Sequence, residues 1–300
     1  MSALFDHAGL TTTTDSPVTS LAEIMSAFTY ALDLTEGQPA GHSLRACWIA
    51  LHLAEALDLP PAERRTVYYA TMLKDLGCSS NAARIAEVYL ADDRAFKRDY
   101  KLVGAGLGPV LSFVFSRTGA GEPLGRRARA IANILRNGPE IARSLIETRC
   151  TRGADIARLL RFPEPVAQAI AGLDEHWDGS GKPAGLAGTA IPLAARLALL
   201  AQIAEVFAAN AGPDAARAEV ARHRGGWLDP ALSDLFAALA ADPAFWTTLR
   251  SPLLETMLIA REPAPQLLPV DEDFLDDIAL AFGQVIDAKS PCTGGHSARV

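Results

Sequence analysis

GHSLR, residues 41–45, is the stretch around which the predicted fold is organised, because nearly the same five residues return as GHSAR at 295–299. A gap-free shift of 254 positions also aligns four upstream pairs, namely Ile24 with Ile278, Ala27 with Ala281, Phe28 with Phe282 and Asp33 with Asp287. Positions three and four apart lie on one face of a helix. The sequence therefore predicts a helical unit that occurs twice.

Helix signals extend outward from this stretch over most of the chain. Ser20 and Glu23 have the spacing of a capping box, which predicts the start of the first helix. Three more helices are predicted to start where a typical N-cap residue precedes proline, at Asp229-Pro230, Asp242-Pro243 and Ser251-Pro252. The sequence predicts an all-α fold, a multi-helix bundle, in which residues 137–139 (Asn-Gly-Pro) separate helices over 126–136 and 140–147.

The chain divides into four predicted segments. Residues 1–19 are polar and threonine-rich, which predicts a flexible tail, and residues 20–260 form one large helical domain. Residues 261–272 combine three prolines with acidic residues, which is typical of a linker. Residues 273–300 are expected to begin a second, similar domain with its first helix.

The composition indicates a globular protein with ample apolar material. Of its 300 residues, 49% are hydrophobic and 21% charged. The four cysteines are scattered without a C-x-x-C pair, which excludes a disulfide framework and favours a reducing cytoplasm. No membrane span is predicted, since the most apolar stretch, 191–207, is interrupted by charged residues. No signal peptide is predicted either, since the N-terminus lacks basic residues followed by an apolar stretch.

The net charge of −7 makes nucleic acid an unfavourable ligand, but the charge is unevenly distributed. Ten arginines and only four acidic residues fall between 117 and 161. Solvated helix faces explain this excess most simply, and a patch for an anionic nucleotide or an acidic partner is the alternative.

Three further motifs lead to a family. His42 is accompanied by Ser43 and Arg45, a helix then ends in Asp75-Leu76-Gly77, and WDGSGKPAGL follows at 177–186. Together, over residues 24–235, they resemble the HD-GYP branch of the metal-dependent HD phosphohydrolases. The resemblance implies an all-helical enzyme that holds iron or manganese ions with histidine and aspartate and hydrolyses cyclic di-GMP. Paired metals generate a hydroxide nucleophile and neutralise the attacked phosphate.

Most of the metal ligands implied by this resemblance are replaced. His42 and Asp75 match the pattern, but four ligand positions are lost, at Lys74, Arg149, Leu173 and Gln202. Lys74 stands where the HD pair has its histidine, and an ammonium has no lone pair to offer a metal. The domain 20–260 is therefore predicted to be a non-catalytic module without a metal, acting in regulation or in homodimerisation.

Other interpretations remain open for this domain. His42, Asp75 and Asp174 make a one-histidine, two-carboxylate set that would suit a single hard metal in a reduced phosphohydrolase site. A binding module that senses a cyclic dinucleotide without cleaving it, or a scaffold for a signalling protein partner, would need no metal.

The loop that carries the most specific part of the resemblance is expected to be structural. Glycines allow tight backbone turns, and an aspartate can accept hydrogen bonds within its own turn. The residues singled out in this loop are Glu175, Asp178, Gly179, Gly181, Lys182 and Pro183. Lys182 replaces the tyrosine of the name-giving Gly-Tyr-Pro, and it and Trp177 are candidates for contact with a partner protein.

The second copy of the opening motif resembles the family more closely than the first. Residues 282–300 match the family's opening pattern through His296, a candidate metal ligand. This resemblance predicts the start of an intact catalytic domain that holds iron or manganese. Because the sequence stops at Val300, before a second ligand, the chain is expected to be part of a longer protein.

Overall fold

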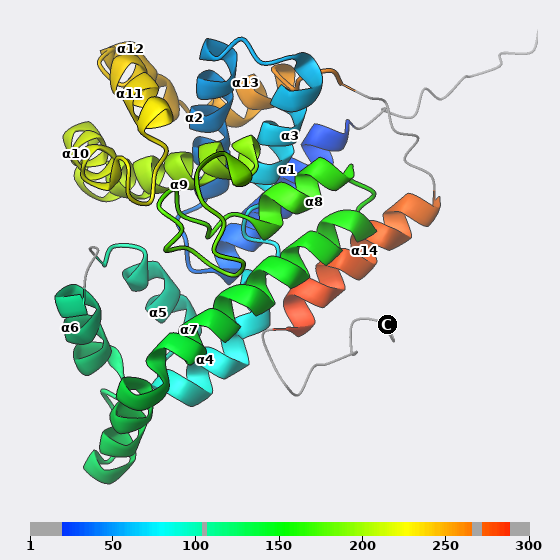
Figure 1. Cartoon of the computed structure of the whole chain (residues 1–300). Helices are drawn as coiled ribbons and strands as arrows, with labels where there is room; N and C mark the ends of the chain where they lie inside the picture. Colours follow the sequence, from blue (N-terminus) through cyan, green and yellow to red (C-terminus); the bar gives the residue numbers. More distant parts are fainter. Residues whose placement is uncertain (1–19, 104–106, 266–271, 289–300) are drawn as a thin grey trace, which may run out of the picture.

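The computed structural model describes residues 20–103, 107–265 and 272–288, in which fourteen α-helices and two 3₁₀ turns are packed together without a β-strand (Figure 1). The all-α prediction is confirmed. The α-helices are α1 Leu21–Thr35, α2 His42–Ala56, α3 Pro61–Met72, α4 Ala82–Tyr89, α5 Asp93–Tyr100, α6 Leu107–Arg117, α7 Leu124–Leu159, α8 Glu164–Ala171, α9 Leu193–Ala211, α10 Pro213–His223, α11 Pro230–Leu239, α12 Pro243–Leu249, α13 Leu254–Ala260 and α14 Glu272–Asp287. The 3₁₀ turns are η1 Cys78–Asn81 and η2 Gly188–Ala190.

The helix starts follow from local capping. Ser20 Oγ accepts a hydrogen bond from Glu23 N (3.2 Å), and the Glu23 carboxylate accepts one from Ser20 N (2.7 Å), so the predicted capping box is confirmed. Asp229 and Asp242 likewise cap α11 and α12, each of which begins with proline. The third predicted start is wrong by two residues. Ser251 caps a turn through the N–H of Leu253, and α13 begins only at Leu254.

Helices α2, α3 and α9 form the centre of the main core, and each of them contacts the other two. Leu51 on α2 and Leu197 on α9 are fully buried there. Helix α9 is apolar on nearly every side because neighbouring helices surround it. By length and composition α9 would also be able to span a membrane, but more than half of it is buried inside the bundle, as in the core helix of a globular protein.

Helix α7 is continuous over 36 residues, and the predicted break at 137–139 is wrong. Pro139 removes one backbone donor, but its fixed φ is compatible with a helix. Ile134, before the proline, and Ile141, after it, are both buried in one cluster with residues of α4, α5 and α6. Packing on both sides of Pro139 therefore holds the helix together. This second cluster occupies the lower left of Figure 1, beside the first half of α7.

Helix α14 packs against α1, α7 and η1 and lies beside α7 in Figure 1. Phe274, Ala281 and Val285 on one of its faces are buried in the main core. The predicted linker 261–272 falls between the end of α13 and the start of α14, and residues 266–271 lie outside the described ranges. The predicted tail 1–19 and His296 also lie outside them. The division into domains stays a prediction.

Candidate functional site

His42, the first residue of α2, lies in the interior of the protein. Gly41 precedes it with a φ of +77°, a conformation that glycine adopts without strain, and this turn directs the chain inward. His42 Nδ1 contacts Glu205 Oε2 of α9, and Nε2 lies 4.0 Å from Asp75 Oδ2. Burial, and then the charge of Lys74, lower the pKa of His42 to about 4. The imidazole is therefore neutral at pH 7.

Asp75 follows the end of α3 and is surrounded by donors. Lys74 Nζ contacts Asp75 Oδ2 and donates to Ser43 Oγ at 3.1 Å, and Lys101 Nζ lies 3.7 Å from Asp75 Oδ1. Burial alone would raise the pKa of Asp75, but the ammonium groups of Lys101 and Lys74 outweigh it and hold this pKa well below its usual range. Cys78 Sγ also donates to Asp75 Oδ1, at 3.3 Å.

Gly77 explains why the D-x-G pattern ends in glycine. A Cβ atom at this position would lie 1.9 Å from the carbonyl oxygen of Arg149 on α7. The absence of a side chain at Gly77 therefore allows α7 to approach the chain directly before η1. This approach brings Arg149 close to the Asp75 region, where its guanidinium forms an ion pair with Asp174.

The Glu175–Pro183 loop is held by its own hydrogen bonds. The buried Glu175 carboxylate accepts from Ala184 N (2.7 Å) and Leu186 N (2.8 Å), and Asp178 Oδ1 accepts from Ser180 N (2.9 Å). Gly179 has a φ of +79°.

Two further positions tie the loop to its surroundings. A Cβ atom on Gly181 would lie 2.2 Å from the backbone nitrogen of His176, and Lys182 N donates to the backbone carbonyl of Asp174 at 3.0 Å. The loop thus presents the side chain of Lys182 from a defined backbone, and these contacts give a structural reason for its composition.

A cavity of about 340 Å³ collects several of the predicted residues. Asp174, Lys182, Arg149 and Gln202 all line it, although they come from the motif loop, α7 and α9. Lys101, directly after α5, lines it as well. Of the other predicted positions, Leu173 is buried in the main core, and neither His42 nor Asp75 contributes to the cavity wall.

The donor set behind this cavity does not fit a metal ion. Lys74 and Lys101 both direct ammonium groups at the Asp75 carboxylate, and Lys101 Nζ also lies 3.4 Å from His42 Nε2. A protonated amine cannot donate a lone pair and repels a cation. Among the described residues no group of three or more histidine, cysteine, aspartate or glutamate side chains is placed to hold a metal.

Sequence reasoning missed Lys101 and Glu205. Lys101 opens the glycine-rich stretch 101–125, in which no pattern indicates what the side chain contacts. Glu205 did carry a signal, because an isolated acid within the apolar α9 is expected to have a partner when it is buried. Burial alone would raise the pKa of Glu205, but His42 and then Arg45 lower it below its usual range.

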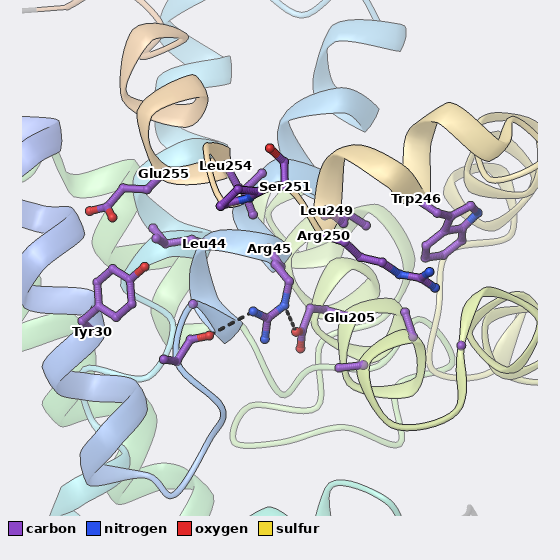
Figure 2. A pocket seen from close by; sticks show the side chains of 16 residues that line it. Tyr30, Leu44, Arg45, Glu205, Trp246, Leu249, Arg250, Ser251, Leu254 and Glu255 are labelled. Atoms are coloured by element: carbon purple, nitrogen blue, oxygen red, sulfur yellow. Dashed lines mark hydrogen bonds and ion pairs between the residues drawn. The ribbon is translucent and has the colours of Figure 1, made fainter.

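Glu205 also reaches a second and larger cavity, of about 590 Å³. Figure 2 shows Arg45 there, with its Nε donating to Glu205 Oε1 (2.6 Å) and its Nη1 to the carbonyl oxygen of Ala40 (3.0 Å). Tyr30, Trp246 and Arg250 form other parts of the wall. None of the candidate site residues predicted from the sequence lines this cavity, so its connection to His42 runs through Glu205.

Comparisons with known proteins show what the chain is similar to. Residues 139–232 match the family model described as HD domain. The chain is 46% identical over 280 residues to the 3'3'-cGAMP-specific phosphodiesterase 3 of Vibrio cholerae, covering 93% of this chain and 61% of that protein. A probable cyclic di-GMP phosphodiesterase of the same organism is 41% identical over 78 residues, covering 24% of this chain and 18% of that protein.

A solved structure extends the similarity to the fold. The crystal structure of a cyclic GMP-AMP specific phosphodiesterase of V. cholerae matches with a TM-score of 0.72 at 40% identity. The match covers 93% of this chain and 63% of that one. The chain thus spans about three fifths of the length of these two extensive matches.

Proposed function

We propose, on the premise that this chain is an HD-domain protein, that it forms part of a cyclic dinucleotide phosphodiesterase in which residues 20–260 are a non-catalytic regulatory or dimerisation module. The observation that carries the proposal is the pair of ammonium groups, from Lys74 and Lys101, on the Asp75 carboxylate. HD phosphodiesterases generally use divalent metals, and these lysines take up the carboxylate that a metal would need.

Catalysis is proposed to belong to the second copy of the opening motif, which contains His296. This copy matches the HD-GYP pattern more completely than the first does. Iron or manganese is the metal expected there, where it would supply a hydroxide nucleophile and neutralise the phosphate charge. The scattered cysteines, of which Cys47, Cys78 and Cys150 are free and buried, support a cytoplasmic location.

The substrate class is a cyclic dinucleotide. The HD-GYP resemblance favours cyclic di-GMP, whereas the name of the relative that is 46% identical favours 3'3'-cGAMP. Measuring hydrolysis of both compounds decides between them. We expect no turnover by the 300-residue chain with added Mn²⁺ or Fe²⁺, and turnover by a chain that includes the complete second copy. Metal-dependent turnover by residues 1–262 alone would overturn the assignment.

Cyclic dinucleotide sensing by the first module is a second candidate function. The cavity of about 340 Å³ combines three cations, on Lys101, Arg149 and Lys182, with aromatic rings on Tyr100 and Trp227. Cations pair with phosphates and aromatic rings stack on bases. The arrangement favours an anionic nucleotide over a neutral ligand.

Isothermal calorimetry tests the sensor. We expect binding of a cyclic dinucleotide to weaken about tenfold in Lys182→Ala, because one phosphate partner is lost, and to weaken with added salt. Arg126→Ala, which makes the same charge change on an exposed part of α7 outside the cavity, should bind like the parent. Equal weakening in both variants would point to general charge rather than to this cavity.

The geometry of the described residues argues against a reduced single-metal site of His42, Asp75 and Asp174, because these three side chains are not grouped to hold a metal. Elemental analysis of the purified protein beside Asp75→Ala tests it. One equivalent of metal in the parent that is lost in the variant would support the site, and no metal in either protein would rule it out.

A further inference from the structure

Helix α14 exposes an apolar stripe. Leu275, Phe282 and Ile286 are 50%, 39% and 37% exposed, and the exposed Ala279 lies between them. The spacings of four, three and four residues place these side chains on one face of the helix. Exposed apolar side chains are ordinary when scattered, but a stripe at helical spacing is typical of a face that packs against something.

The internal repeat indicates what this face packs against. The shift of 254 positions aligns the stripe with four residues of α1, pairing Leu275 with Leu21, Ala279 with Met25, Phe282 with Phe28 and Ile286 with Leu32. All four α1 residues are buried in the main core. There α1 contacts α2, α3 and α13. The face that α1 buries in its bundle is therefore largely exposed on α14, where Phe282, at the edge of the stripe, also touches Phe28 of the first bundle.

Another face of α14 is buried where the matching face of α1 is not fully buried. Phe274, Ala281 and Val285 are buried against the first bundle. Their counterparts in the first copy are Ser20, Ala27 and Ala31, of which Ala27 is exposed. Helix α14 thus has apolar residues on a face where α1 has small or polar ones. The first bundle covers only one of these two faces, so the exposed stripe needs a further body to cover it.

Three contacts hold α14 in this position. Arg161, just after α7, forms an ion pair with Asp277 (2.7 Å) and lies over the ring of Phe274, with its guanidinium carbon 5.4 Å from the ring centroid. Phe28 and Phe282, which are equivalent in the repeat, meet edge to face with centroids 5.6 Å apart. Contact between equivalent residues is the pattern of an interface between two like bodies.

We propose that α14 is an interface helix whose stripe, Leu275, Ala279, Phe282 and Ile286, belongs to the core of a second HD-type bundle. The counterparts of α2, α3 and α13 in that bundle cover the stripe, while Phe274, Ala281 and Val285 fasten it to the first. The inference rests on the proposed tandem arrangement. A protein as long as the phosphodiesterase that is 46% identical has room for such a bundle, because this chain covers 61% of that protein.

Cysteine labelling tests the proposal directly. Ile286→Cys and Ala288→Cys are made separately in a Cys292→Ser background, both in the 300-residue chain and in a chain continued through the second copy. Ala288 is the matched control, since it is partly exposed directly after α14 and its counterpart in the first copy, Leu34, is 66% exposed. We expect maleimide to modify the Ala288→Cys variant at similar rates in both chains. The Ile286→Cys variant should react at least about tenfold more slowly in the continued chain, because the second bundle protects its thiol.

Two outcomes overturn the proposal. Equal labelling of position 286 in both chains would mean that no second bundle covers the stripe. Sedimentation that shows a dimer of the 300-residue chain, abolished by Ile286→Asp but not by Ala288→Asp, would identify a second copy of this chain as the occupant.

A thermal measurement supports the labelling and separates this proposal from the functional one. In the continued chain Ile286→Asp should lower the Tm by about 5 °C or more, and Ala288→Asp should change it little. If the continued chain hydrolyses cyclic dinucleotides but tolerates Ile286→Asp, the interface proposal fails while the proposed function stands.

Discussion

Lys74 brings a positive charge into the interior, where its ammonium contacts Asp75 and Ser43. Ser43 Oγ in turn donates to Asp33 Oδ1 at 2.9 Å, so the charge is part of a buried chain of polar groups. A buried pair of this kind costs desolvation energy and is stabilising only while both partners remain. A buried lysine at position 74 is therefore compatible with a stable interior.

The Lys74–Asp75 pair leads to a prediction about stability. Lys74→Met should lower the free energy of unfolding by about 2–4 kcal/mol, because Asp75 would keep the Cys78 thiol as a weak donor and only the more distant Lys101 as a cationic partner. Arg126→Met, which breaks an exposed pair with Glu122, should cost no more than about 0.5 kcal/mol. Urea denaturation of both variants checks this, and equal costs would contradict the assigned role of burial.

His42 leads to a prediction about pH. Its pKa in the folded protein is about 4, below the 6.5 of an unperturbed histidine, so its contribution to stability is complete above pH 6.5 and is lost as the pH falls through about 4. The stability advantage of the parent over His42→Gln should therefore shrink by up to about 1.4 kcal/mol per pH unit between about pH 6 and 4.5.

Comparing the parent with His42→Gln isolates the contribution of His42 to the pH dependence of stability. Burial raises the pKa of Asp33 to about 6, but Asp33 titrates in both proteins and largely cancels. Urea denaturation across the pH range supplies the free energies, and an NMR titration of the ring nitrogens supplies the pKa. A midpoint near 6.5 for His42, the value of an unperturbed histidine, would contradict the prediction.

At the scale of elements, α7 is positioned by the close approach of Gly77. Because a Cβ atom there would meet the Arg149 carbonyl, Gly77→Ala should lower the free energy of unfolding by about 3 kcal/mol or more. The control is Gly125→Ala in the first turn of α7, where nothing lies within 4 Å of the added atom and no proline follows. That variant should be stabilised by about 0.5–1 kcal/mol, since alanine favours a helix.

Circular dichroism during thermal unfolding distinguishes these two outcomes. A neutral Gly77→Ala would show that α7 and the chain directly before η1 can separate at little cost. Such a result would remove the reason given for the glycine of the D-x-G pattern.

At the scale of the whole molecule, two hydrophobic clusters share α7. The smaller one joins Phe113 and Ile134 to residues of α4 and α5, and the larger contains α2, α3 and α9. Phe113→Ala should accelerate hydrogen exchange in α4–α6 and the first half of α7 while leaving α2 and α9 protected. Uniform acceleration throughout the chain would show that the two clusters unfold as one unit.

The helical fold follows from local features that the sequence states directly. The Ser20 capping box and the Asp-Pro starts of α11 and α12 depend only on neighbouring residues, and each forms as predicted. The repeat and the inability of Lys74 to bind a metal are likewise properties of residue type and order. No tertiary information is needed for either.

Contacts between distant residues could not be predicted from the sequence. Glu205 reaches His42 across 163 positions, and Lys101 reaches Asp75 from the far side of η1, α4 and α5, and neither spacing leaves a local pattern. The continuity of α7 was likewise decided by Ile134 and Ile141 in a shared cluster, which overcame the local effect of Pro139.

The repeated GHSLR and GHSAR stretches show the same difference between what the sequence predicts and what the tertiary structure decides. The order of residues alone predicts a helical unit that occurs twice, because matching residues at a constant offset can be found without a structure. Only the tertiary structure decided that α14 buries one apolar face and exposes another. Burial is a property of the assembled molecule, in which helices far apart in the chain cover each other's surfaces.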